Sequence, residues 1–178
     1  MTNKWLVIGQ LGSGKTTFSR KLAMSIDGAA VHLDELIWDS GWEEVSNAVL
    51  QQRVSEKIGK SSHYVTEGVL VDKLSPDLPR FYDGIIFLDI PFYLCFFRAT
   101  RRNFIRVFTR EKICGDNRES IFSFVYTMFG MTFKHRSRQS KFYDLTEKFK
   151  TAGQESMVFQ NNNQANSWLM TIQDKTRA

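Results

Sequence analysis

The 178-residue sequence has few residues that cross-link or break a chain, since it contains two cysteines, three prolines and no long apolar run. Cys95 and Cys114 cannot form a disulfide framework, and neither has the spacing of a redox or zinc motif. This pattern favours a reducing compartment. The lack of an apolar segment long enough for a signal peptide or a bilayer span predicts a cytoplasmic protein with no membrane partner.

The composition is that of an ordinary globular protein, with 42% hydrophobic and 24% charged residues, which excludes disordered and collagen-like chains. Its length predicts a single domain over residues 1–178. The net charge of +5 is unevenly spread, because residues 98–138 contain ten Lys and Arg against three acids. This cationic segment predicts an anionic partner, with phosphate as the leading choice.

Short apolar runs without clear alternation recur along the chain, as expected for strands that are buried on both faces. They lie at residues 5–8, 29–33, 64–66, 85–88 and 157–159. Segments of helical character separate them, beginning near residue 15 and continuing at 45–59, 91–109, 118–134, 139–151 and 164–172. Strands that alternate with helices predict an α/β fold with a parallel sheet covered on both sides.

A phosphate-binding motif follows the first predicted strand. Residues 9–16 match the pattern G-x-x-x-x-G-K-[ST] at the start of a helix, where the backbone N–H groups and the helix N-terminus can surround phosphates. We expect Lys15 to reach the β- and γ-phosphates of ATP and Thr16 to ligate Mg²⁺. The residues expected to bind the nucleotide are Gly9, Gly12, Ser13, Gly14, Lys15, Thr16 and Thr17.

Three carboxylates follow predicted strands, at the sheet edge where α/β proteins bind ligands. Asp34 could orient a phosphoryl acceptor or cap the next helix. Glu67 could hold Mg²⁺ or the acceptor, and the adjacent Gly68 would let a ligand approach closely. Asp89 could support the metal or cap the helix that begins near Pro91.

Two further groups are candidates for substrate contacts. Trp38 and Trp42 follow the second predicted strand, where aromatic side chains either stack a flat substrate or cover the core. Arg136 and Arg138 form a second basic cluster behind an aromatic helix and could supply another phosphate contact.

The segment 91–109 is predicted to be an amphipathic helix with a cationic face. One side of its helical wheel carries Arg98, Arg102, Arg106 and Arg110, and the other carries Phe96, Phe97, Phe104, Val107 and Phe108. The arginines could clamp a transferring phosphoryl group, dock on nucleic acid or form a solvated face. Their mutual repulsion at i, i+4 spacing, with no acid among them, favours the clamp.

These motifs together resemble the adenylate-kinase-like P-loop proteins known as DNA topology modulation proteins, and the likeness covers most of the chain. The blocks that carry it, besides the phosphate loop, are His32-Leu33-Asp34-Glu35-Leu36-Ile37-Trp38, Gly41-Trp42, Thr66-Glu67-Gly68, Phe87-Leu88-Asp89-Ile90-Pro91 and Asn117-Arg118-Glu119-Ser120. Such proteins usually have Asp-Gly after the third strand, so the longer carboxylate of Glu67 must do the metal or acceptor work here.

The resemblance implies a nucleoside-monophosphate-kinase-like, three-layer P-loop fold with five parallel strands in the order 2-3-1-4-5. It also implies ATP and Mg²⁺ as cofactors, an acceptor site near Asp34, and a helical basic lid around Arg102 to Arg118, within an arginine-rich region at about 98–138.

The leading hypothesis is a kinase that transfers a phosphoryl group from ATP to a small molecule, with a nucleotide or nucleoside as the best choice. Lys15 and Asp34 would be catalytic, together with Arg98, Arg102 and Arg106, which would neutralise charge on the transferring group. Two rivals stay open: an ATP-binding regulator whose basic segment grips DNA, and a bare ATPase. The acceptor, the pathway and the oligomeric state are left open by the sequence.

Overall fold

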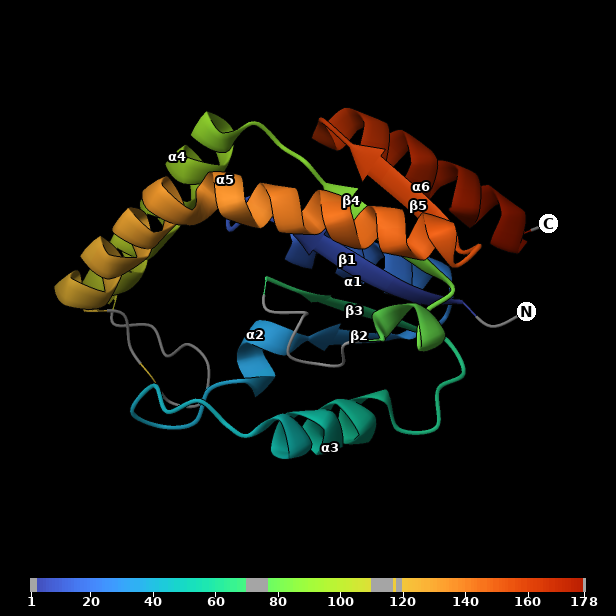
Figure 1. Cartoon of the computed structure of the whole chain (residues 1–178), viewed down its shortest axis with the longest axis horizontal. Coiled ribbons are helices and arrows are strands. Elements are labelled where there is room, and N and C mark those ends of the chain that lie inside the picture. The colour runs from blue at the N-terminus through green and yellow to red at the C-terminus, as the bar shows by residue number, and fades with distance from the viewer. Residues whose placement is uncertain (1–2, 70–76, 110–116, 118–119, 178) are drawn as a thin grey trace.

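The computed structural model describes residues 3–69, 77–109, 117 and 120–177. They form a five-stranded parallel sheet with the strand order β2-β3-β1-β4-β5. The strands are β1 (Lys4–Gly9), β2 (Ala29–His32), β3 (Tyr64–Gly68), β4 (Gly84–Leu88) and β5 (Glu155–Phe159). Both the five strands and their order confirm the predicted topology (Figure 1).

Helices cover both faces of this sheet (Figure 1). They are α1 (Lys15–Ser25), α2 (Leu33–Leu36), α3 (Asn47–Ile58), α4 (Phe92–Thr109), α5 (Ile121–Thr151) and α6 (Asn162–Arg177), with a 3-10 turn at Leu78–Arg80. No helix in the described ranges is long and apolar enough to cross a membrane.

The side chains of β1 alternate between two apolar clusters, which makes the fold three-layered. Trp5 and Val7 pack in one cluster with residues of α1 and α6, such as Phe18. Leu6 and Ile8 pack in the other cluster with residues of α2, α3 and α5. Because both faces are buried, the strand shows no polar alternation in sequence, as the prediction assumed.

The long helix α5 corrects one prediction. Two separate helices were expected at 118–134 and 139–151, but the structure has a single helix of 31 residues. A capping box formed by Ser120 and Ser123 begins it, and the segment around Arg136 and Arg138 contains no proline or glycine that would end it. Only Gly130 weakens the helical pattern, and a single glycine is tolerated inside a helix.

Helices α4 and α5 form an antiparallel hairpin that extends past the end of the sheet (Figure 1). The rings of Phe92 and His135 lie 4.3 Å apart, and Thr100 Oγ1 donates a hydrogen bond to Met128 Sδ at 3.0 Å. Gln10 Nε2 donates to the His135 carbonyl at 3.0 Å, so the hairpin also contacts the loop after β1. The hairpin occupies the region expected to form the lid, whose residues 110–116 and 118–119 lie outside the described part.

The wheel prediction for α4 is wrong about its apolar side. The buried row of the helix is Cys95, Ala99 and Asn103, whereas Phe104 and Phe108 are exposed. Small side chains form this row because α4 packs closely here, with the Cys95 carbonyl directly against the phosphate loop.

We predict opposite effects for two glycine-to-alanine substitutions. Gly12→Ala would place a Cβ 2.2 Å from the Cys95 carbonyl oxygen at a residue with φ of +82°, so it should destabilise the protein by about 1 kcal/mol or more. Gly130→Ala meets nothing within 4 Å inside α5 and should stabilise by about 0.5–1 kcal/mol. Urea unfolding measures both, and equal effects would contradict the packing described.

Candidate functional site

The loop between β1 and α1 forms a cradle at the carboxyl edge of the sheet. Gly12 and Gly14 have φ values of +82° and +94°, which L residues with side chains rarely adopt. The first turn of α1 contains no acid that would offset the positive end of the helix. Ser13 Oγ is buried and has no hydrogen-bond partner among the described residues. An anion in the cradle would satisfy these donors.

Lys15 lies buried at the start of α1, and its ammonium group donates a hydrogen bond to the Gln10 carbonyl at 3.2 Å. Because lysine has three donors and this carbonyl is the one hydrogen-bond acceptor found for it within the described part of the chain, the ammonium group retains unused donors. The residue therefore holds positive charge within the loop, where the sequence predicted contact with the β- and γ-phosphates.

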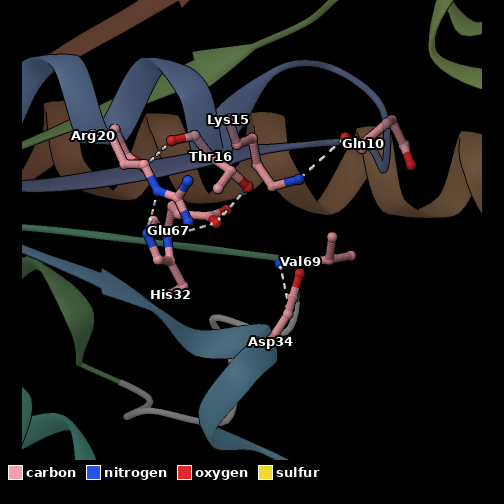
Figure 2. Close-up of polar contacts among 9 residues, drawn as sticks. Gln10, Lys15, Thr16, Arg20, His32, Asp34, Glu67 and Val69 are labelled. Carbon is pink, nitrogen blue, oxygen red and sulfur yellow. Dashed lines mark hydrogen bonds and ion pairs between the residues drawn. The ribbon is translucent and has the colours of Figure 1, made fainter. Parts of the chain in front are cut away.

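Glu67, at the end of β3, connects the phosphate loop to the neighbouring strand. Its Oε1 accepts hydrogen bonds from Thr16 Oγ1 at 2.8 Å and from His32 Nδ1 at 3.0 Å (Figure 2). His32 and Glu67 are register partners on the adjacent strands β2 and β3. The parallel register thus places the imidazole beside the carboxylate.

Arg20 fixes the proton on the imidazole. Its Nε donates to His32 Nε2 at 3.1 Å, so this ring nitrogen acts as an acceptor (Figure 2). The proton of the neutral ring is then on Nδ1, which donates it to Glu67. The sequence motifs predicted no role for either His32 or Arg20.

The environment of Glu67 keeps its carboxyl group charged. Burial raises its pKa, but the His32 hydrogen bond, the Lys15 charge and the Thr16 hydrogen bond together hold the pKa below the ordinary value. Its second oxygen, Oε2, is buried without a partner among the described residues. A buried carboxylate oxygen in this state is expected to bind a cation or an ordered water.

Asp34 approaches the same region from α2 (Figure 2). Its Oδ1 accepts a hydrogen bond from the Val69 backbone N–H at 3.4 Å, so it does not cap α2, whose N-cap residue is His32. Burial and the neighbouring Glu67 raise the pKa of Asp34 above the ordinary carboxyl value, despite the opposing charges of Lys15 and Arg102. A carboxylate with a raised pKa near a phosphate cradle is suited to accept a proton near neutral pH.

Gly68 explains how α2 comes so close to β3. A Cβ at this position would lie 2.9 Å from Leu33 Cβ and 3.4 Å from Asp34 Oδ1. The sequence predicted that this glycine would admit a ligand. In the structure the space is filled by Leu33 and Asp34, so the glycine positions the candidate base.

Asp89 differs from Asp34 and Glu67 because both of its carboxylate oxygens accept hydrogen bonds from side chains of α5. Its oxygens accept hydrogen bonds from Gln139 Nε2 at 2.7 Å and from the Tyr143 hydroxyl at 2.6 Å. These bonds attach the end of β4 to α5, and the Tyr143 pKa rises to about 12 because its hydroxyl donates to Asp89. Of the two carboxylates predicted to support a metal, Glu67 is the one with a buried oxygen left over.

The predicted arginines occupy different surroundings. The charge of Arg102 acts on Asp34, and that of Arg98 acts on Cys95 beside the phosphate loop. Arg106 lies half-buried one turn farther along α4. In α5, Arg136 is exposed and Arg138 is half-buried, and both follow His135, whose carbonyl contacts Gln10.

Trp38 and Trp42 pack against each other edge to face, with ring centroids 5.9 Å apart. Trp42 has a φ of +61°, an uncommon conformation for a bulky residue. Asn117 holds this loop, because its Oδ1 accepts from the backbone N–H groups of Gly41 and Trp42 and its Nδ2 donates to the Asp39 carbonyl. This contact joins the tryptophan loop to the end of the expected lid.

The residues present fit ATP and Mg²⁺. The glycine cradle, the Ser13 hydroxyl and Lys15 suit a polyphosphate, and Thr16 with Glu67 Oε2 offers oxygen ligands for Mg²⁺. Within the described ranges no three His, Cys, Asp or Glu side chains gather as a metal cage. Mg²⁺ bound through one or two protein oxygens and substrate phosphates needs no such cage.

Solved structures share this architecture. The chain matches shikimate kinase from Bacteroides thetaiotaomicron over 100% of both chains, with a TM-score of 0.50 and 13% sequence identity. It matches shikimate kinase from Acinetobacter baumannii, solved in complex with shikimate, over 98% of this chain and 94% of that one, with a TM-score of 0.51 and 14% identity. The chain has the fold of a P-loop kinase. No protein-family model matches it, and neither does any curated protein sequence.

We predict that Asp34→Asn stabilises the fold at neutral pH. Because the folded-state pKa of Asp34 is raised, the folded protein binds this proton more tightly than the unfolded chain does, and the charged form costs stability. That cost is present above the folded-state pKa and disappears as the pH falls through it toward the ordinary carboxyl value.

Thermal melts at pH 7.5 and at pH 4 should therefore show a higher Tm for the variant at pH 7.5 and a smaller difference at pH 4. Glu35→Gln removes the same charge from the exposed neighbour on α2 and serves as the control. A lower Tm for Asp34→Asn at pH 7.5 would contradict the assignment.

Proposed function

We propose that this protein is an ATP-dependent kinase that phosphorylates a small molecule. The observation that carries the proposal is the Glu67 carboxylate, which is bonded to Thr16 of the phosphate loop and keeps a buried, unpartnered oxygen beside it. Asp34, with its raised pKa, faces the same space from the other side. A nucleotide cradle, a metal ligand and a base together fit phosphoryl transfer.

Each residue has a separate task in this scheme. The loop amides, Ser13 and Lys15 bind the phosphate tail and neutralise part of its charge. Asp34 orients the acceptor and takes its hydroxyl proton, while Arg102 adds positive charge where the transferring group passes. Mg²⁺, held by Thr16 and Glu67, would supply further charge neutralisation on the phosphates.

His32 and Arg20 act through Glu67. By fixing the imidazole proton on Nδ1, they direct Oε1 toward Thr16 and His32 and leave Oε2 for the metal. We therefore assign them as positioning residues, in the manner of the outer partners that orient metal ligands.

A nucleotide or nucleoside is the acceptor we favour. Trp38 and Trp42 supply aromatic surface on the Asp34 side of the cradle, where a flat ring can stack. We assign the adenine of ATP to the loop after β5, because Asn162 at the start of α6 lies 3.9 Å from the position of a Gly14 Cβ. The expected lid, formed by the α4–α5 hairpin and its arginines, would exclude water during transfer.

We further propose that the chain belongs to the DNA topology modulation group, that the protein is cytoplasmic, and that residues 1–178 form a single domain. The shared P-loop kinase fold is compatible with the first, and the sequence motifs support it.

The proposal is tested by an ADP-release screen with Mg²⁺ across nucleoside monophosphates, nucleosides and small hydroxyl compounds. Release that rises with one acceptor, matched by formation of its phosphorylated product, supports the kinase. Equal release with and without every acceptor would instead indicate a bare ATPase.

Lys15→Ala should reduce acceptor-dependent ADP release by about 100-fold or more, because the buried ammonium neutralises phosphate charge in the transition state. Lys21→Ala removes the same charge from an exposed position of α1 and should have little effect. Initial rates and nucleotide calorimetry measure this difference. Retained turnover in Lys15→Ala would refute the role given to the loop.

Asp34→Asn should lower kcat by about 10²- to 10⁴-fold, the usual contribution of a positioned base. Because the Asp34 pKa is raised, activity of the native enzyme should fall on the acid side at a pH above the ordinary carboxyl range. That acid limb should be missing from the residual activity of the variant, whereas Glu35→Gln should keep it. An unchanged acid limb in Asp34→Asn would assign the titration to another group.

A further inference from the structure

The α4–α5 hairpin exposes an apolar surface that the kinase scheme does not use. We call it the aromatic face. Its members on α4 are Tyr93, Phe97, Phe104 and Phe108, and its members on α5 are Ile121, Phe122, Val125, Tyr126, Phe129 and Phe133. Phe122 is 89% exposed and Phe133 is 75% exposed, values far from those of core side chains. An exposed cluster of this size on a soluble domain marks a docking surface.

The two halves of the aromatic face lie on the same side of the hairpin. Thr100 and Met128 mark the line where the antiparallel helices touch. Successive residues of an α-helix are rotated by about 100° around its axis. Counted in the direction of increasing residue number, the members on α4 lie about 20–80° from Thr100, and the members on α5 lie about 20–160° from Met128. Two antiparallel helices that turn in the same sense from a shared contact line present one continuous side.

The candidate active site lies on another side of α4. By the same count, Arg102 is about 160° from Thr100 in the opposite sense, and its charge acts on Asp34. The aromatic face is therefore separate from the side that meets the phosphate cradle.

The hairpin is strongly cationic around this apolar surface. Residues 91–143 contain eleven Lys and Arg against three acids. In the described ranges 91–109 and 120–143 there is no Asp or Glu at all. Arg101 is exposed beside the α4 part of the aromatic face, and Arg136 is exposed on the side of α5 that carries the other part. A second copy of the chain would bring two such cationic hairpins together, which opposes association through this face.

We propose that the aromatic face docks on an anionic lipid bilayer. Phenylalanine and isoleucine side chains would enter the boundary between headgroups and acyl chains, while the surrounding arginines and lysines contact lipid phosphates. Duplex nucleic acid would match the charge but offers no apolar layer to cover the phenylalanines. The finding that no helix in the described part of the chain could span a membrane does not conflict with this attachment, because a helix that lies in the interface does not cross the bilayer.

Vesicle sedimentation of the full chain tests the proposal with two lipid mixtures, pure phosphatidylcholine and phosphatidylcholine with 30% phosphatidylglycerol. We expect binding to the anionic vesicles to exceed binding to the neutral ones by at least tenfold and to weaken in high salt. The double variant Phe122→Ser with Phe133→Ser should bind at least tenfold less, since both side chains are already in water and the fold should persist.

Met24→Ser is the matched control, because Met24 is 81% exposed on α1, away from the hairpin, and its loss should leave vesicle binding unchanged. Lys15→Ala should also bind vesicles normally, which separates this proposal from the kinase assignment. Melting curves check that every variant is folded.

Three outcomes would overturn the proposal. The first is failure of the vesicle test, in which the native protein shows no preference for anionic vesicles or the double variant binds them as well as the native protein does. The second is a dimer in light scattering that the double variant dissociates without any vesicle binding, which would give the face to a second copy. The third is binding to single-stranded or duplex oligonucleotides that the double variant loses while vesicles are ignored.

Discussion

The candidate site depends on how one carboxylate is shared. Glu67 Oε1 accepts from Thr16 on the phosphate loop and from His32 on the neighbouring strand, so three separate segments meet at one oxygen. Hydrogen bonds to a charged group contribute about 1.5–3 kcal/mol each. Together with the Lys15 charge they outweigh the burial that raises the pKa of Glu67. The same bonds leave Oε2 unpartnered and Thr16 oriented. The phosphate loop, the proposed metal ligand Glu67 and the β2–β3 edge are thereby fixed relative to one another.

Much of the fold could be predicted because it rests on local patterns. The glycines of the phosphate loop need special φ values, and strands such as β1, buried on both faces, appear as unbroken apolar runs. Thr16, Asp34 and Glu67 could be placed at one sheet edge from chain order alone, since parallel strands end on the same side. The pairing of Glu67 with His32 could not, because strand register in a parallel sheet is set by tertiary packing.

The sequence-based predictions were less accurate for residues that had two physically reasonable sets of partners. Asp89 precedes a helix and was predicted either to support the metal or to cap that helix. It instead accepts hydrogen bonds from Gln139 and Tyr143, which lie 50 and 54 positions away, where no local sequence pattern points. The wheel of α4 separated arginines from aromatics correctly but could not show which arc packs inward. That arc is the small-residue row ending at Asn103, because only small side chains allow α4 to abut the phosphate loop.

The hydrogen bond between Gln10 and the carbonyl of His135 has a mechanical consequence. It joins the nucleotide cradle to the middle of a 31-residue helix, which at 1.5 Å per residue is a rod about 46 Å long. The helix is continuous from Ile121 to Thr151, so a shift of the loop that moved the His135 carbonyl would be carried along the helix in both directions.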